Sequence, residues 1–116
     1  MVPDDRRKRN GLQTFARVFS AARKANYPFI YKAYPGIGHV SDERARSLGF
    51  ACFDFVRAEA AKSQGAPNLQ SIFAASAHVA DVYNQRACRD ADADSIPPEN
   101  RMPVPSAEIL RAWVGE

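Results

Sequence analysis

The sequence has 116 residues, of which 46% are hydrophobic and 25% charged, and it carries a net charge of +3. This composition is typical of one small globular domain and excludes a disordered or collagen-like chain. No apolar run approaches the roughly 20 residues that span a bilayer. The first residues also lack the apolar stretch of a secretory signal, so we expect a cytoplasmic protein that does not enter a membrane.

The two cysteines and the basic run at the start give no sign of a metal or nucleic-acid site. Cys52 and Cys88 are far apart and form neither a Cys-x-x-Cys pair nor a zinc spacing. Because nothing indicates secretion, we expect no disulfide between them. The basic residues 6–9 have no aromatic residues among them, although stacking on single strands requires these. We interpret the run as the solvated start of a helix and do not expect nucleic-acid binding.

Neither the second histidine nor the aspartate-rich segment predicts a bound group. His78 has no second ligand at helical spacing, so a structural or surface role is expected. Asp90, Asp92 and Asp94 alternate with alanine but lack the glycine and the closing glutamate of a calcium loop. We therefore expect a solvated loop here, and neither a metal ion nor a cofactor in the protein.

The first half of the chain predicts a helix, a strand and a second helix, in that order. Apolar residues recur every three or four positions over residues 7–25, as in an amphipathic helix, and Asn26 is a suitable stop. Residues 28–34 are rich in aromatic and β-branched residues and, except for Lys32, apolar on both faces, which indicates a strand covered by helices. Ser41 is a good N-cap for the second helix, whose pattern fades near residues 64–67.

The second predicted helix is apolar on nearly all sides. Phe50 and Phe53 lie off its main apolar stripe, so the helix requires cover from more than one direction. Phe73 and Trp113, further along the chain, are expected to be core or docking residues.

The remainder of the chain, residues 65–116, gives a weaker signal. Residues 69–77 fit a short helix or a loop, and residues 78–83 fit a short extended segment. Four prolines within residues 97–105 impose an extended connection. Ser106 then caps a final short helix. We expect this part to be an irregular, partly helical tail.

A glycine-rich loop with a histidine follows the predicted strand. Residues 35–39 read Pro-Gly-Ile-Gly-His, and the next helix begins directly after them. A general base must be held at the end of a rigid element while its ring reaches a nucleophile on another loop. Small residues let the backbone turn sharply, and a near-neutral pKa lets an imidazole take and return a proton. These features make His39 a candidate base.

Residues 34–39, Tyr-Pro-Gly-Ile-Gly-His, resemble the histidine loop of α/β-hydrolases. The resemblance is nearest to the branch of dienelactone-hydrolase-like and prolyl-oligopeptidase-like proteins, and residues 12–34 share its helix and last strand. It implies an α/β fold, that of a C-terminal hydrolase fragment over residues 1–64 followed by the tail of residues 65–116. Residues 96–113 resemble the C-terminal tails of that branch only loosely. In this family the order nucleophile, acid, histidine places the histidine late, so His39 would be the triad base.

The triad acid would lie before the first helix. In the family this acid is on a loop some tens of residues upstream of the histidine, and Asp4 and Asp5 both occupy such a position. We favour Asp5 slightly over Asp4. The alternative is that both are ordinary charges on a frayed terminus.

The nucleophile of the family is missing. No serine of the sequence lies in a Gly-x-Ser-x-Gly elbow, and neither cysteine has the flanking glycines. The resemblance implies hydrolysis of an ester, lactone or peptide bond through acyl transfer. Without a nucleophile His39 has nothing to activate, so we expect the chain to be inactive alone and to depend on a second chain that supplies the nucleophile.

A second interpretation is a non-catalytic interaction or structural module. In this case the edge of the strand at residues 29–34 and the apolar helix faces would form a homodimer, and His39 would be a remnant of a hydrolase ancestor. A Gly-x-Ser-x-Gly motif encoded upstream of Met1 would favour the first interpretation, and unrelated coding there would favour the second.

Overall fold

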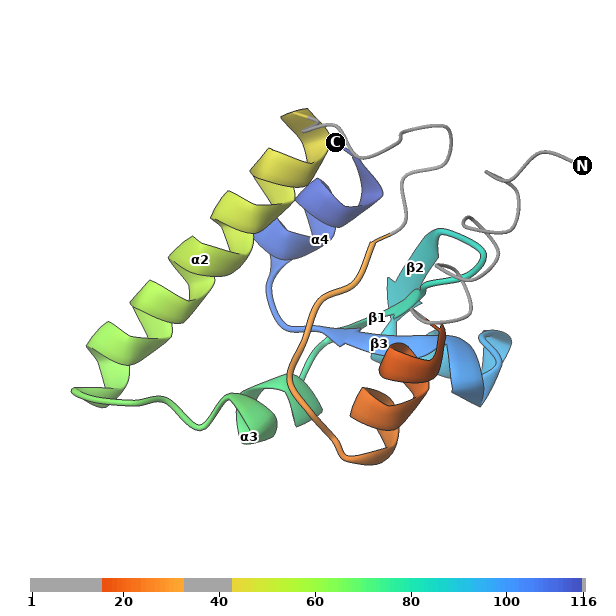
Figure 1. Cartoon of the computed structure of the whole chain (residues 1–116), viewed down its shortest axis with the longest axis horizontal. Helices are drawn as coiled ribbons and strands as arrows, with labels where there is room; N and C mark the ends of the chain where they lie inside the picture. Colours follow the sequence, from red (N-terminus) through yellow and green to blue (C-terminus); the bar gives the residue numbers. More distant parts are fainter. Residues whose placement is uncertain (1–15, 33–42, 116) are drawn as a thin grey trace, which may run out of the picture.

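The computed structural model describes residues 16–32 and 43–115. Over these residues the protein is a mixture of helices and one small antiparallel sheet of three strands (Figure 1). The expectation of a fold with both helices and strands is thereby confirmed. None of the described helices is long and apolar enough to cross a membrane.

The first helix ends where the sequence predicts. Residues 16–24 are helical, and Asn26 has a φ of 55°, the left-handed conformation that terminates helices. The amide of Tyr27 donates to the carbonyl oxygen of Ala22 at 2.8 Å, which closes the last turn. The rest of the predicted helix, residues 7–15, lies outside the described residues.

The strand predicted at residues 28–34 is not a strand in its described part. Residues 28–32 have no helical or strand pairing; the remaining two positions lie outside the described residues. Phe29, Ile30 and Tyr31 instead pack their side chains against the core. The Tyr31 amide donates to the sulfur of Met102 at 3.1 Å. The apolar side chains that predicted a strand therefore pack against the core without strand pairing of the main chain.

The second predicted helix is confirmed as α2, Glu43–Ser63. It ends at Gln64, whose φ of 54° is again left-handed. Leu48 is its one fully buried residue. Figure 1 shows α2 as a long rod with only its first half against α4 (Ala107–Val114).

The segment expected to be an irregular tail contains the sheet. Strand β1, His78–Asp81, is central and pairs antiparallel with β2, Arg86–Arg89, and with β3, Arg101–Val104. The expected extended segment at residues 78–83 thus contains β1, but β2 was not expected. Strands of four residues are too short to show a period-two pattern clearly, and Pro103 is tolerated because β3 is an edge strand.

Short helices fill the connections around the sheet. Helix α3, Leu69–Ala74, begins at Asn68, whose side chain accepts from the Ser71 amide at 3.1 Å. The 3-10 helix η1, Asp90–Ser95, takes the place of the expected solvated loop, and η2, Pro98–Asn100, leads into β3.

The last helix, α4, was predicted correctly. Ser106 caps it by accepting from the Ile109 amide at 3.1 Å, and Gly115 ends it with a φ of 91°.

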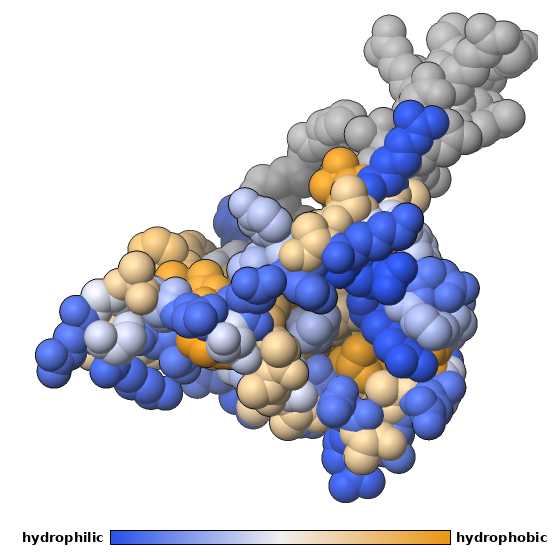
Figure 2. All heavy atoms as spheres, turned by 90° about the horizontal axis from the view of Figure 1, so that it is seen from below, coloured by the Kyte–Doolittle hydropathy of each residue, from blue (hydrophilic) through white to orange (hydrophobic). Residues whose placement is uncertain are grey.

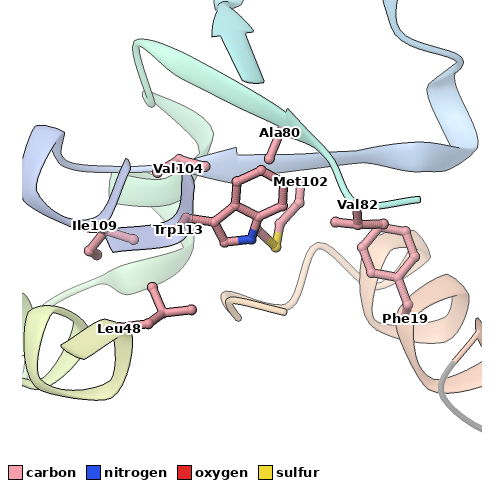
Figure 3. Packing of buried hydrophobic residues seen from close by; sticks show 8 residues of the cluster. All are labelled: Phe19, Leu48, Ala80, Val82, Met102, Val104, Ile109 and Trp113. Atoms are coloured by element: carbon pink, nitrogen blue, oxygen red, sulfur yellow. The ribbon is translucent and has the colours of Figure 1, made fainter. Parts of the chain in front are cut away.

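One cluster of buried side chains joins both halves of the sequence. Trp113 is fully buried and lies beside Met102 at its centre (Figure 3). The residues of the cluster are Phe19, Leu48, Ala80, Val82, Met102, Val104, Ile109 and Trp113. The expected boundary at residues 64–65 falls in the link between α2 and α3, and the cluster draws on residues from both sides of it.

Candidate functional site

The three residues predicted to form a catalytic apparatus lie outside the described residues. These are His39, Asp5 and Asp4, together with the whole of the loop at residues 35–39. The structure does describe the segment that enters this loop and the helix that leaves it. The segment before the loop and the start of α2 after it are therefore the described parts of the chain that adjoin the predicted site.

The entry to the loop is fixed by the last helix. The indole Nε1 of Trp113 donates to the main-chain oxygen of Tyr31 at 2.7 Å. The ammonium group of Lys32 lies 4.0 Å from the centre of the same indole ring, which is within the range of a cation–π interaction. Two successive residues before the loop are thus held by one buried side chain.

The start of α2, which follows the loop, lies beside the same helix, α4, as Lys32, which precedes the loop. Burial lowers the pKa of Lys32, and the positive charge of Arg44 on α2 lowers it further. Lys32 lies against the indole ring of Trp113 in α4, and Arg44 lines a hollow together with Ala112 and Gly115 at the end of α4. The last described residue before the loop, Lys32, and the first turn of α2 after it therefore both lie beside α4.

A small hollow of about 210 Å³ adjoins the exit of the loop. Glu43, Arg44 and Ser47 from the first turns of α2 form one wall, and Ala112 and Gly115 from α4 form the other. A carboxylate, a guanidinium and a hydroxyl group therefore line the described surface that is closest in sequence to His39.

The best-defined polar cluster in the described residues is centred on Asp81 at the end of β1. Its side chain is fully buried. One oxygen accepts from the main-chain amide of Asn84 and from the side-chain amide of Asn100, both at 3.1 Å. The other accepts from Nδ2 of Asn84 at 2.9 Å and from Nε of Arg86 at 3.3 Å. Every partner is a donor, so the site fits an ionised carboxylate.

The role of Asp81 is structural. Burial alone would raise the pKa of the carboxyl group, but the hydrogen bonds from Asn84, Asn100 and Arg86 outweigh it and the pKa is lowered. An acid held ionised in this way does not exchange protons near neutral pH. Sequence reasoning did not single out Asp81, although aspartate side chains commonly stabilise turns by accepting from main-chain amides a few residues later.

The described residues contain no group of three or more His, Cys, Asp or Glu side chains that could hold a metal ion. Two of the aspartates in η1 face arginines instead: Asp92 lies 3.5 Å from Arg89, and Asp94 lies 4.0 Å from Arg101. Cys52 and Cys88 are free thiols, and burial raises the pKa of Cys52.

Comparisons with protein-family models, curated proteins and solved structures found no match to this chain.

Proposed function

We propose that this chain is the C-terminal part of an α/β-hydrolase and that it contributes the catalytic histidine. The observation that carries the proposal is the motif at residues 34–39, Tyr-Pro-Gly-Ile-Gly-His, placed between the first helix and α2. In this role His39 is the general base. Asp5, or alternatively Asp4, orients its imidazole and stabilises the imidazolium ion that forms.

The state of residues 28–32 supports this proposal. In an α/β-hydrolase this segment would be the last strand of a parallel sheet, and its neighbour would belong to the part that carries the nucleophile. A strand without that neighbour has no ladder to join. The lack of strand pairing at residues 28–32 is therefore what an isolated C-terminal part should show.

The outward face of α2 also supports the proposal. Phe50 and Phe53 are exposed to 68% and 61%, and Val56 is also exposed. Neighbouring aromatic side chains left in water on one helix are typical of a surface that another structure covers. In a complete hydrolase the nucleophile-bearing part would supply this cover.

The substrate class follows from acyl transfer, namely an ester, a lactone or a peptide. The nucleophile and the oxyanion hole would come from the other part of the enzyme. His39 would take the proton of the nucleophile during attack and return it to the leaving group.

The pairing of histidine and acid can be tested in the chain itself. NMR titration of the His39 imidazole should show a lower pKa in Asp5→Asn than in the native chain, because a nearby carboxylate favours the imidazolium ion. If Asp4 is the acid, Asp4→Asn gives this result and Asp5→Asn does not. An unchanged pKa of His39 in both variants would remove the proposed acid.

The exposed face of α2 also favours a second candidate function, a non-catalytic module that forms a homodimer. Burial of Phe50 and Phe53 against a second copy would then stabilise the dimer. The strand edge at residues 29–34 no longer supports this candidate, because residues 29–32 are not a strand. Within the part of the chain that the structure describes, the face of α2 remains as the dimer interface for this candidate.

A further inference from the structure

We infer that a pocket between the first helix, α3 and β3 binds a small organic carboxylate with an apolar body. The pocket has a volume of about 600 Å³. Its lining comes from three separate parts of the chain, among them Arg23, Tyr27, Phe29, Phe73 and Arg101. Figure 2 shows the molecule from below the view of Figure 1, with hydrophilic residues interleaved with smaller apolar areas.

The charge of the pocket favours an anion. Two guanidinium groups, those of Arg23 and Arg101, line it, and no aspartate or glutamate is among the described residues of the lining. The nearest carboxylate to Arg101 is that of Asp94, at 4.0 Å and fully exposed. An anion in the pocket would form charge-assisted hydrogen bonds with these guanidinium groups.

The side chain of Arg23 also has an unpaired donor. Its Nε is buried and has no hydrogen-bond acceptor among the described residues. A buried donor without an acceptor is costly, the more so when it is charged. A carboxylate is a planar acceptor that fits the planar fork of a guanidinium group, so a ligand of this kind would pair with the part of the Arg23 side chain that lines the pocket.

The aromatic side chains define the rest of the ligand. Phe29 packs edge-to-face on the buried Phe19, with ring centres 5.4 Å apart. Phe73 packs in the same manner on Phe55 of α2 at 6.3 Å. Both rings are therefore held in place before a ligand arrives, which reduces the entropy lost on binding. They offer an apolar wall for an aromatic or aliphatic body next to the charged group.

Arg101 is also fixed in advance. Its Nε donates to the carbonyl oxygen of Ile96 at 2.9 Å, which anchors the side chain. Arg23 is the better residue to replace, because it makes no such structural hydrogen bond. The pocket does not draw on the residues of the proposed hydrolase site, so ligand binding here is independent of that proposal.

The test is a titration of the isotope-labelled whole chain with 4-phenylbutyrate, followed by NMR, beside its uncharged analogue 4-phenylbutanamide. We expect the carboxylate to shift the amide signals of Phe29, Phe73 and Ala74. The amide should bind more weakly by roughly tenfold or more, since hydrogen bonds to charged groups are the stronger ones. Equal affinities for both compounds, or no shifts at these residues, would overturn the proposal.

Variants locate the binding site. Arg23→Gln should weaken 4-phenylbutyrate binding by roughly tenfold or more, whereas Arg17→Gln, an exposed charge on the same helix, should leave it unchanged. If both variants weaken binding equally, the net charge of the chain and not the pocket attracts the ligand. Inorganic phosphate should bind less tightly than 4-phenylbutyrate. If it binds as tightly, the apolar walls play no part and the proposed ligand class is wrong.

Discussion

Trp113 and Tyr31, which are 82 positions apart in the sequence, are joined by a 2.7 Å hydrogen bond from the indole Nε1 to the main-chain oxygen. This bond ties the last helix to the segment that enters the histidine loop. The indole ring itself packs in the core beside Met102 (Figure 3). The C-terminal part of the chain therefore supports the region where the catalytic residue is proposed.

Replacing Trp113 by phenylalanine should separate the hydrogen bond from the packing. The smaller ring keeps much of the apolar contact but leaves the oxygen of Tyr31 without its donor, at a cost of about 1–3 kcal/mol. Urea unfolding followed by circular dichroism measures the loss. Val114→Ala, at the exposed neighbouring position, should change the free energy of unfolding by less than about 0.5 kcal/mol. A Trp113→Phe variant as stable as the native chain would mean that the bond contributes nothing.

Asp81→Asn should destabilise the fold. All four hydrogen-bonding partners of Asp81 are donors, so the amide nitrogen of asparagine would face another donor. The expected loss is about 1–3 kcal/mol, measured by urea unfolding at pH 7. Asp92→Asn, at an exposed position, should cost less than about 0.5 kcal/mol.

The contribution of Asp81 should depend on pH. Its pKa is lower in the folded than in the unfolded chain, where it is about 4. The stabilisation is therefore complete above about pH 4 and disappears as the pH falls through the lowered pKa. The difference in unfolding free energy between the native chain and Asp81→Asn should shrink over this acidic range. A difference that stays constant with pH would show that the charge of Asp81 is not responsible.

Ser106→Ala should remove the cap of α4 and cost about 1 kcal/mol. Ser47→Ala is a matched control, because Ser47 is exposed inside α2 and alanine is the better helix former there. Thermal unfolding should show a lower melting temperature for Ser106→Ala and an equal or higher one for Ser47→Ala. A reversed order would contradict the assigned role of the cap.

The outward face of α2 should affect association and not folding. Phe50→Ser combined with Phe53→Ser removes two exposed rings, so the unfolding free energy should change little, whereas Leu48→Ala removes a buried residue and should cost about 2–5 kcal/mol. If the chain forms a homodimer through this face, sedimentation velocity will show a dimer for the native chain and a monomer for the double variant. A native chain that stays monomeric at high concentration would exclude the homodimer.

Local signals predicted the helices well. Asn26 as a stop, the long periodic run of α2 and Ser106 as a cap each depend on residues close together in sequence, and each is confirmed. The short antiparallel sheet was not expected, because the pairing of β1 with β3 joins residues such as Ala80 and Met102 that are distant in sequence, and the nearby strands β1 and β2 have only four residues each. Pattern analysis does not contain that information.

At residues 28–32 the opposite happened: a strand was predicted where the structure has none. A short run of aromatic and β-branched residues reads as a strand, but a strand forms only where a neighbour completes its hydrogen bonds. In the described structure the side chains of Phe29, Ile30 and Tyr31 pack on the core, and the main chain joins no ladder. At the candidate site, sequence reasoning selected His39, Asp5 and Asp4 by their motif and spacing and did not find the buried network around Asp81.

The most direct measurement of the central claim is labelling with a fluorophosphonate probe in the native setting. The chain would be tagged at its own genomic locus, purified with whatever accompanies it, and compared with His39→Ala treated identically. We predict that a serine outside residues 1–116 is labelled, in a second chain or in a longer form of this one, and that His39→Ala abolishes labelling while purification is unchanged. Absence of any labelled species, or equal labelling in His39→Ala, would contradict the assignment of this chain to a hydrolase.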